Sequence, residues 1–293
     1  MHAAVLLWGF TGVLGKAISL SAPVLVWYRM LMTAVFMAFI LTYRKQWVKV
    51  ERRDMGRLAL VGVLMGLHWT AFYGSIKYST ASIALVCLST SPVFTTIFNQ
   101  LIHRDLFNAK ELLLGMIALL GMYFIYQFQQ FYAMGIILGI IAAILAALFT
   151  VINKSIAHKY PSRTMVFYEM GTGWIFITLL MPLQIIYVPN TVLLPQHLDW
   201  LWLVVLSLCC TVWAQSLALN ALKLISSFTA TLSVNLEPVY GIILAFVIYH
   251  ENKLLHPGFF IGMGLILLSV LLQIFILLKP NTKELIEDKG GID

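Results

Sequence analysis

Three formally charged side chains stand deep within long apolar runs of the sequence: Arg29, Glu169 and Glu237. A charge in such a position is costly unless it pairs, reaches water or belongs to a solute or proton pathway. The guanidinium group of Arg29 suits a carboxylate, and Glu237 can hold a proton or a substrate amine. His68, which lies at a depth similar to that of Glu237, is the second candidate for proton exchange. A histidine satisfied by its neighbours is the alternative for His68.

Depth along the apolar runs separates these charges. Arg29 lies about five residues into its run from the outer side and Glu169 about five residues into its run from the cytoplasmic side, so each is about 8 Å deep at about 1.5 Å per residue. In an apolar layer about 30 Å thick they are about 15 Å apart and should not pair. We expect Lys154 to form a charge pair with Glu169. Arg29 can reach inward to Glu237 or outward to lipid headgroups, so structural anchoring and binding of a substrate carboxylate both stay open.

Two prolines, Pro92 and Pro238, occupy matching positions near the middle of their runs. Each removes a backbone donor and frees the carbonyl group one turn earlier, on Leu88 and on Val234. Freed carbonyl groups at membrane depth need a neighbouring helix, a water-filled cavity or a solute as partner. A purely structural kink is the alternative. The residues that we place along a solute pathway on this ground are Ser91, Pro92, Asn235 and Pro238.

Aromatic side chains are dense in the same runs, and the candidates to line the pathway are Trp8, Trp69, Tyr73 and Tyr240. They favour a neutral or amphipathic organic solute whose ammonium group or ring can contact their faces. Core packing or anchoring at the lipid interface is the alternative. Phosphorylated sugars and nucleotides need several intramembrane cations, and Arg29 alone does not provide them.

The elements that carry these residues are apolar helices. Of the 293 residues, 61% are hydrophobic and 11% charged, and the mean hydropathy is +0.91, which is typical of a polytopic membrane protein. No HExxH, GxSxG, GxGxxG or P-loop motif occurs, so we expect neither an enzyme nor a bound cofactor or metal. Apolar runs predict ten transmembrane helices, over residues 2–18, 24–43, 56–76, 80–101, 109–127, 132–153, 164–184, 198–221, 226–249 and 257–279.

Lysines and arginines divide unequally between alternate connections. Fifteen of the 19 fall on one side, many of them in residues 44–57, three fall on the other, and Arg29 lies within a run. By the positive-inside rule both termini are cytoplasmic, and the connections 127–130 and 188–200 face outside. The net charge of +7 then reflects basic residues that lie on the cytoplasmic side, next to anionic lipid headgroups. Nucleic-acid binding is not expected. The polar tail 280–293 is expected to be disordered.

The second half of the sequence repeats the first. Residues 79–82 precede Ser91-Pro92 by the same spacing at which residues 225–228 precede Glu237-Pro238. Further upstream, Tyr28-Arg29-Met30 matches Tyr168-Glu169-Met170. The chain is thus two copies of a five-helix unit, residues 1–127 and 132–279. Because five is odd, the copies must lie in opposite orientations, as in the inverted repeats of many secondary transporters.

These motifs resemble the EamA-type members of the drug/metabolite transporter superfamily. The resemblance implies a bacterial inner-membrane carrier of ten helices around a central cavity, usually an exporter of amino acids or related metabolites. The second repeat departs from the pattern, with Ala146-Ala147 in place of the Trp-Gly pair and Glu169 in place of Arg29, which leaves the substrate open. The motifs that carry the resemblance are Trp8-Gly9 with Lys16, Tyr28-Arg29, Thr80-Ala81-Ser82 with Ser91-Pro92, and Asn235-Leu236-Glu237-Pro238.

We therefore expect an all-α membrane protein, with ten transmembrane helices as two inverted five-helix EamA-like repeats and a cytoplasmic tail. Its expected function is secondary transport, the export of a small amino-acid-like metabolite by alternating access, with proton coupling left open. A broad-range drug or metabolite exporter is one alternative, and a scaffold or enzyme in the membrane is another. The expected partners are a small-molecule substrate and the lipid bilayer, and the choice between monomer and homodimer stays open.

Overall fold

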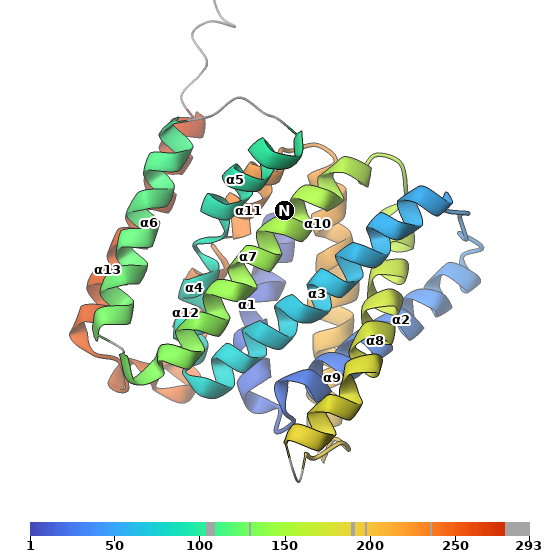
Figure 1. Ribbon diagram of the computed structural model, residues 1–293, viewed down its shortest axis with the longest axis horizontal. Coiled ribbons are helices and arrows are strands. Elements are labelled where there is room, and N and C mark those ends of the chain that lie inside the picture. Colours follow the sequence, from blue (N-terminus) through green and yellow to red (C-terminus); the bar gives the residue numbers. More distant parts are fainter. Residues whose placement is uncertain (104–108, 129, 189–190, 197, 235, 279–293) are drawn as a thin grey trace, which may run out of the picture.

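The computed structural model describes residues 1–103, 109–128, 130–188, 191–196, 198–234 and 236–278 (Figure 1). Over these residues the chain is helical and contains no strand, so the predicted all-α class is confirmed. The helices are α1 His2–Ala17, α2 Ala22–Tyr43, α3 Arg52–Tyr78, α4 Ala81–Leu88, α5 Ser91–His103, α6 Ala109–Phe128, α7 Ala133–Ile156, α8 Ser162–Tyr187, α9 Asp199–Ser207, α10 Ala214–Leu222, α11 Ser227–Val234, α12 Glu237–Tyr249 and α13 Pro257–Leu278. Three short turns complete them: η1 Gln130–Tyr132, η2 Leu208–Trp213 and η3 Glu251–Lys253.

Six helical stretches are long and apolar enough to cross a membrane, so the chain is an integral membrane protein. Shorter apolar stretches add to them at Leu113–Ile125, Glu237–Tyr249 and Pro257–Ser269. The count of ten spans stays a prediction. The six long stretches are Ala22–Tyr43, Arg52–Tyr78, Ala81–Ile102, Ala133–Ile156, Ser162–Tyr187 and Asp199–Leu222.

Three of the predicted helices are interrupted. The first break separates α4 from α5 and the second separates α11 from α12, in both cases just before the proline. A proline fits the first turn of a helix, where no N–H donor is needed, so each run restarts as a new helix where we expected a kink. Ser91 Oγ donates to the carbonyl group of Leu88 at 2.7 Å and satisfies the group that Pro92 leaves free. The third interruption is η2, a π-helical turn between α9 and α10.

Helix α3 crosses the centre of the view in Figure 1, α7 and α8 pack against it, and α2 packs against α8. Gly62 permits this close approach, because a Cβ atom there would meet the backbone of Glu169 and Gly173 on α8. Helix α1 packs against α12 and α4. Helices α6 and α13 form a separate pair at the edge of the bundle, in contact at Gly121 and Gly262 (Figure 1).

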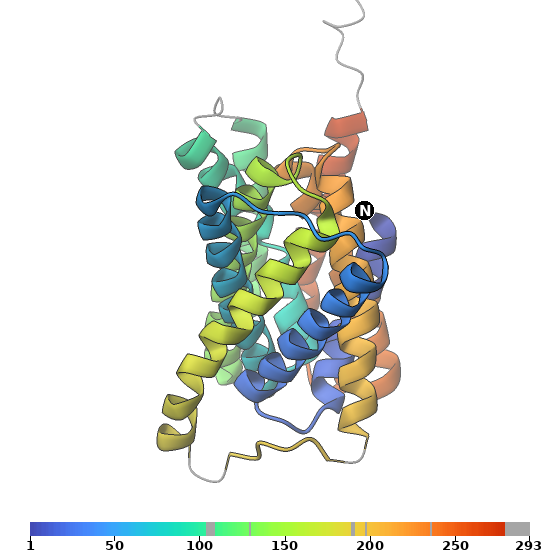
Figure 2. The same ribbon diagram turned by 90° about the vertical axis from the view of Figure 1, so that its right-hand side faces the viewer.

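The bundle has two distinct ends (Figure 2). Met1 and the connection 44–51 lie at one end, which we call the inner end because it is predicted to be cytoplasmic. The connections 18–21 and 191–196 lie at the opposite end, which we call the outer end. Helix α1 begins at the inner end, whereas α7, the first helix of the second half, finishes there (Figure 1).

Candidate functional site

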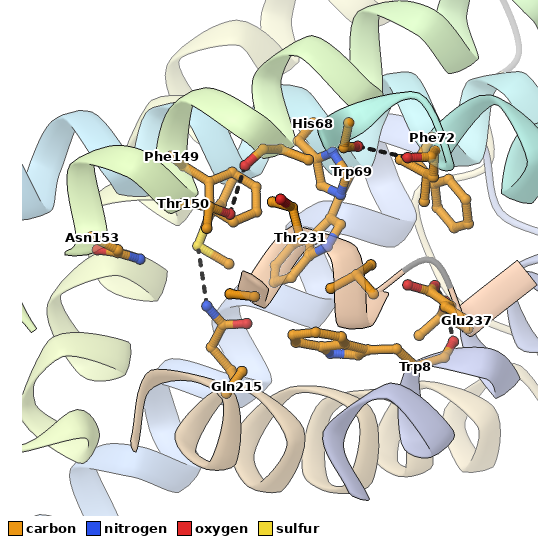
Figure 3. A pocket seen from close by; sticks show the side chains of 18 of the residues that line it. Trp8, His68, Trp69, Phe72, Phe149, Thr150, Asn153, Gln215, Thr231 and Glu237 are labelled. Atoms are coloured by element: carbon orange, nitrogen blue, oxygen red, sulfur yellow. Dashed lines mark hydrogen bonds between the residues drawn. The ribbon is translucent and has the colours of Figure 1, made fainter. Parts of the chain in front are cut away.

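A cavity of about 100 Å³ lies inside the bundle and is lined from Met1 and Asn153, near the inner end, to Thr11, Arg29 and Phe72, in the outer part of their helices. Its walls come from α1, α2, α3, α7 and α10 and from the helices on both sides of the two proline breaks (Figure 3). A mostly apolar wall with a few polar groups is typical of ligand pockets. The polar and aromatic lining residues are Trp8, Thr11, Arg29, His68, Trp69, Phe72, Ser91, Phe149, Thr150, Asn153, Gln215, Thr231 and Glu237.

Arg29 is 1% exposed although it is charged. Its Nε donates to Thr211 Oγ1 at 2.9 Å and its Nη1 to the hydroxyl of Tyr73 at 2.7 Å, with a longer contact of 3.4 Å from Nη2 to the carbonyl group of Cys210. The guanidinium carbon lies 3.7 Å from the centroid of the Trp69 ring, a cation–π contact. Among the described residues, no carboxylate forms an ion pair with Arg29. Because a guanidinium group has five N–H donors, some remain for a ligand.

The π-helical turn η2 supplies the acceptors that hold Arg29. Thr211 Oγ1 accepts from Arg29 and itself donates to the carbonyl group of Leu206 at 2.9 Å. The carbonyl group of Cys210 also accepts from Trp8 Nε1, at 3.0 Å. Turns of this kind interrupt the regular hydrogen-bond ladder and are frequent at functional sites. In this chain the turn joins α1 and α2 into one wall of the cavity.

Glu237 faces the same cavity from the first turn of α12 and is 5% exposed. Its Oε1 lies 3.4 Å from Thr11 Oγ1, which is a long hydrogen bond, and no described cation forms an ion pair with it. Figure 3 shows Glu237 beside Trp8 at one end of the cavity and Asn153 at the other. Two ionisable groups of opposite sign, Arg29 and Glu237, thus face one cavity without pairing.

His68 is satisfied by the backbone. Its Nδ1 lies 2.8 Å from the carbonyl group of Ala142. Because a carbonyl group only accepts, Nδ1 carries the proton and Nε2 is left as an acceptor. The ring of Phe72 stacks parallel to the imidazole at 6.3 Å, and that of Phe149 meets it edge-on at 5.4 Å. This geometry corresponds to the structural alternative, in which His68 ties α3 to α7.

The cavity brings together six of the predicted pathway residues: Trp8, Arg29, His68, Trp69, Ser91 and Glu237. Tyr73 stands behind Arg29 and reaches the site through its hydroxyl group. Pro92 and Pro238 do not line the cavity and shape it by breaking the helices. Tyr240 is 37% exposed and does not line the cavity either. Asn235 lies outside the residues that the structure describes.

The predicted charge pair between Lys154 and Glu169 does not form. Lys154 Nζ donates instead to the carbonyl groups of Leu222 and Ile225, at 2.8 and 2.5 Å, where α10 ends. The last carbonyl groups of a helix have no partner within the helix, so they compete with a carboxylate for the ammonium group. Glu169 is left fully buried, and neither of its carboxyl oxygens has a hydrogen-bond partner.

Sequence reasoning missed several polar lining residues, among them Asn153, Gln215, Thr150 and Thr231. The two amides did carry a signal, since an amide within an apolar run often bonds across helices. The two threonines carried none, because a threonine in a helix usually bonds its own backbone. Thr150 Oγ1 indeed donates to the carbonyl group of Ala146 at 2.8 Å.

Polar contacts gather at the outer end. The fully buried Glu251 accepts from Lys16 Nζ at 2.8 Å and from Oγ and N of Ser82 at 2.6 and 3.0 Å, and we call these three residues the outer lock. Burial raises the pKa of Glu251, but the hydrogen bonds from Lys16 and Ser82 together outweigh it and hold that pKa below its ordinary value. Nearby, Asp199 accepts from N and Oγ of Ser19 at 2.9 and 2.5 Å.

Two curated proteins are related to this chain. An uncharacterized transporter of Haemophilus influenzae (strain ATCC 51907 / DSM 11121 / KW20 / Rd) is 26% identical over 157 residues, or 49% of this chain. The match spans 50% of the length of that relative. An uncharacterized transporter of Archaeoglobus fulgidus (strain ATCC 49558 / DSM 4304 / JCM 9628 / NBRC 100126 / VC-16) is 26% identical over 219 residues, which cover 71% of this chain and 70% of the relative.

A protein of known crystal structure shares the fold. It superimposes with a TM-score of 0.66 over 91% of this chain and 93% of its own, at 15% sequence identity. The EamA-like transporter family matches this chain in two segments, residues 1–127 and 133–275, which together cover most of its length. With apolar spans around a cavity and a family match in both halves, the chain belongs to the EamA-like transporter family and is a membrane transporter.

Proposed function

We propose that this transporter exports a small amino-acid-like metabolite and binds its two charged groups between Arg29 and Glu237. The observation that carries the proposal is that these two side chains face one cavity and do not pair with each other. The guanidinium group has donors left for a carboxylate. The carboxyl group of Glu237, held by one long hydrogen bond, can accept from an ammonium group. A zwitterion supplies both partners.

The size of the cavity favours a small solute. At about 100 Å³ it falls below the range of about 300–1,000 Å³ that is usual for drug-sized ligands. Trp8 and Trp69 add aromatic faces that suit an ammonium group or a short side chain. Both features fit an amino acid better than a large amphipathic compound.

Alternating access is the transport mechanism that we infer. The lining of the cavity reaches Met1 near the inner end, whereas the hydrogen bonds of the outer lock (Lys16, Ser82 and Glu251) hold the outer end together. A carrier with its site accessible from one side only has this arrangement. The two family segments and the opposite directions of α1 and α7 favour inverted repeats, which open to the other side by exchanging their conformations (Figure 1).

A broad-range exporter is the second candidate, and the aromatic part of the wall favours it. Phe72 and Phe149 face the cavity together with the two tryptophans, and such surfaces accept many ring-bearing solutes. In that case Arg29 is a structural anchor held by Thr211 and Tyr73.

Counterflow in proteoliposomes distinguishes the two candidates. The solutes are a panel of neutral amino acids, the same compounds without the carboxylate, the same compounds without the amine, and a set of aromatic drug cations. We expect the intact amino acids to exchange fastest. Arg29→Gln should weaken binding of solutes that bear a carboxylate and leave the amines unchanged, whereas Glu237→Gln should do the reverse.

Two results would count against the amino-acid proposal. Exchange of the drug cations at the rate of the amino acids, unaffected by Arg29→Gln, would favour the broad-range exporter. Exchange of no compound in the panel by a correctly folded protein would remove the support for both candidates. A single symmetric peak in size-exclusion chromatography checks the fold of each variant.

A further inference from the structure

Glu169 is a buried carboxyl group without a partner. Its side chain is 0% exposed, and neither Oε1 nor Oε2 takes part in a hydrogen bond. An ionised carboxylate buried without a cation or donors is so costly that the group gives up its charge instead. Burial without a cation or a donor therefore favours the neutral, protonated form of Glu169 in this conformation.

The buried charged and titratable groups on the neighbouring helices have other partners. Helices α2, α3 and α10 pack against α8, and the described residues of α10 include no titratable side chain. On the other helices, Arg29 binds Thr211 and Tyr73, His68 binds the carbonyl group of Ala142, Asp54 pairs with Lys159, and Lys154 on α7 binds the carbonyl groups of Leu222 and Ile225. None of these groups neutralises Glu169.

Asn153 connects Glu169 with the cavity. The amide of Asn153 is a near neighbour of the Glu169 carboxyl group, although neither carboxyl oxygen forms a hydrogen bond. Asn153 lines the cavity, and its own Oδ1 is buried without a hydrogen-bond partner (Figure 3). Buried polar atoms without partners are rare in folded proteins. Here two such groups, from α7 and α8, are neighbours, and the one on α7 lines the cavity.

The sequence repeat explains why Glu169 lacks the partner that Arg29 has. Position 169 corresponds to position 29, and the register that matches Ser79 with Ile225 matches Tyr73 with Leu219. Arg29 Nη1 donates a hydrogen bond to the hydroxyl group of Tyr73 at 2.7 Å. The second repeat has an apolar side chain, Leu219, at the equivalent place, so the sequence itself leaves this carboxyl group unpaired.

We propose that Glu169 is a proton-binding site, linked to the cavity by the Asn153 amide, and that its proton exchange is coupled to solute transport. The proton is held while the carboxyl group is dry and unpaired. It is released into the cavity when a change of conformation brings water or the amide into hydrogen-bond distance and stabilises the carboxylate. The coupling rests on the proposed transport of a solute, whereas the proton site does not depend on it.

Infrared difference spectroscopy tests the proton site without any solute. The purified protein in lipid is compared in H₂O and D₂O at neutral pH, and the C=O stretching band of a protonated carboxyl group is recorded. We expect a band in the wild type that decreases in Glu169→Gln and is kept in full in Glu51→Gln, a change of an exposed carboxyl group. The same band in Glu169→Gln as in the wild type, or no such band in the wild type, would overturn the proposal.

Proteoliposome transport tests the coupling, with the best amino acid of the counterflow panel as probe. We expect Glu169→Gln to keep counterflow and to lose the accumulation that an imposed pH gradient drives, down to the level seen at equal pH. Glu169→Asp, which keeps a carboxyl group, should restore part of that accumulation. Accumulation in Glu169→Gln equal to that of the wild type would refute coupling at this residue. If no solute is exchanged, the proposed function fails, while the infrared result still decides the proton site.

Discussion

Arg29 keeps its position because Tyr73 accepts a hydrogen bond from Nη1 in a fully buried setting. In Tyr73→Phe this donor loses its acceptor, and a buried donor left without a partner costs about 1–3 kcal/mol. We expect the free energy of unfolding to fall by an amount of that order and the binding of solutes with a carboxylate to weaken. Denaturation followed by tryptophan fluorescence in detergent micelles measures the first effect, and counterflow measures the second.

Tyr240→Phe is the matched control for this change. Tyr240 is 37% exposed, and its hydroxyl group makes no hydrogen bond with a described residue. We expect no change in stability or in binding. Equal losses in the two variants would show that the hydroxyl group of Tyr73 has no special role.

Glu251 makes the stability of the outer end depend on pH. Burial, the largest influence, raises its pKa, but the hydrogen bonds from Lys16 and Ser82 together lower it below the ordinary value of 4.5. The stability that Glu251 adds is therefore complete above the unfolded-state pKa and is lost as the pH falls through the folded-state pKa. We expect the unfolding midpoint of the wild type to drop in acid. Glu251→Gln should be less stable at neutral pH and should lose part of that drop, as measured by thermal unfolding at a series of pH values.

Glu51→Gln, a change of an exposed carboxylate at the start of α3, is the control for Glu251. It should keep the pH dependence of the wild type. A Glu251→Gln protein with the full acid drop would mean that other carboxyl groups cause it.

At the scale of single residues, charged and aromatic side chains within apolar runs indicated which residues line the cavity. Arg29, Glu237, Trp8 and Trp69 stood out as charged or aromatic side chains in apolar runs, and all four line the cavity. The pairing of Glu169 with Lys154 was wrong, because the competing acceptors are backbone carbonyl groups at a helix end, which no residue type reveals.

At the scale of elements, Gly62 on α3 and Gly173 on α8 decide how closely these helices pack. A Cβ atom at Gly173 would meet the backbone of Gly62, so Gly173→Ala must push the helices apart. Overpacking of this kind costs about 1–3 kcal/mol, more than the gain of about 1 kcal/mol from the better helix propensity of alanine. We expect a lower unfolding midpoint, measured by thermal denaturation in detergent.

Gly171, two residues earlier on the same helix, is the matched control. No atom lies within 4 Å of a Cβ placed there, so Gly171→Ala should leave stability unchanged or raise it slightly. A loss in Gly171→Ala equal to that in Gly173→Ala would point to backbone effects rather than to helix packing.

The helices themselves were largely predictable, because apolar runs bounded by charge, glycine or proline mark their ends. The ranges 24–43 and 226–249, for example, fall on α2 and on the pair α11 and α12. The prolines indicated where the fourth and ninth runs are disturbed, although the result is a break and not a kink. The π-helical turn η2 was not predictable, since inserting it changes neither the hydropathy nor the residue types of the run Leu208–Trp213.

At the scale of the whole molecule, the two ends of the bundle predict which residues each side of the membrane can reach. Trp47 near the inner end and Val192 near the outer end are both 48% exposed. In a protein from which the native cysteines have been removed, we expect Val192→Cys to react in intact cells with a membrane-impermeant maleimide. Trp47→Cys should react only after the membrane is opened.

The equal exposure of the two positions makes each the control of the other. Reaction of Trp47→Cys in intact cells, with Val192→Cys protected, would reverse the predicted orientation. Reaction at both positions would indicate a leaky membrane or two orientations.

The outer lock has a consequence for the speed of the proposed cycle. When the outer end opens, Lys16 and Glu251 lose each other but regain water, so the ion pair contributes little to the balance between the closed and open states. Partway through the opening, the two charges have separated but are not yet hydrated. The free energy needed to separate them therefore raises the activation barrier. In the proposed cycle we therefore expect the ion pair to limit how often the outer end opens, with a high activation enthalpy and a turnover rate that rises steeply on warming.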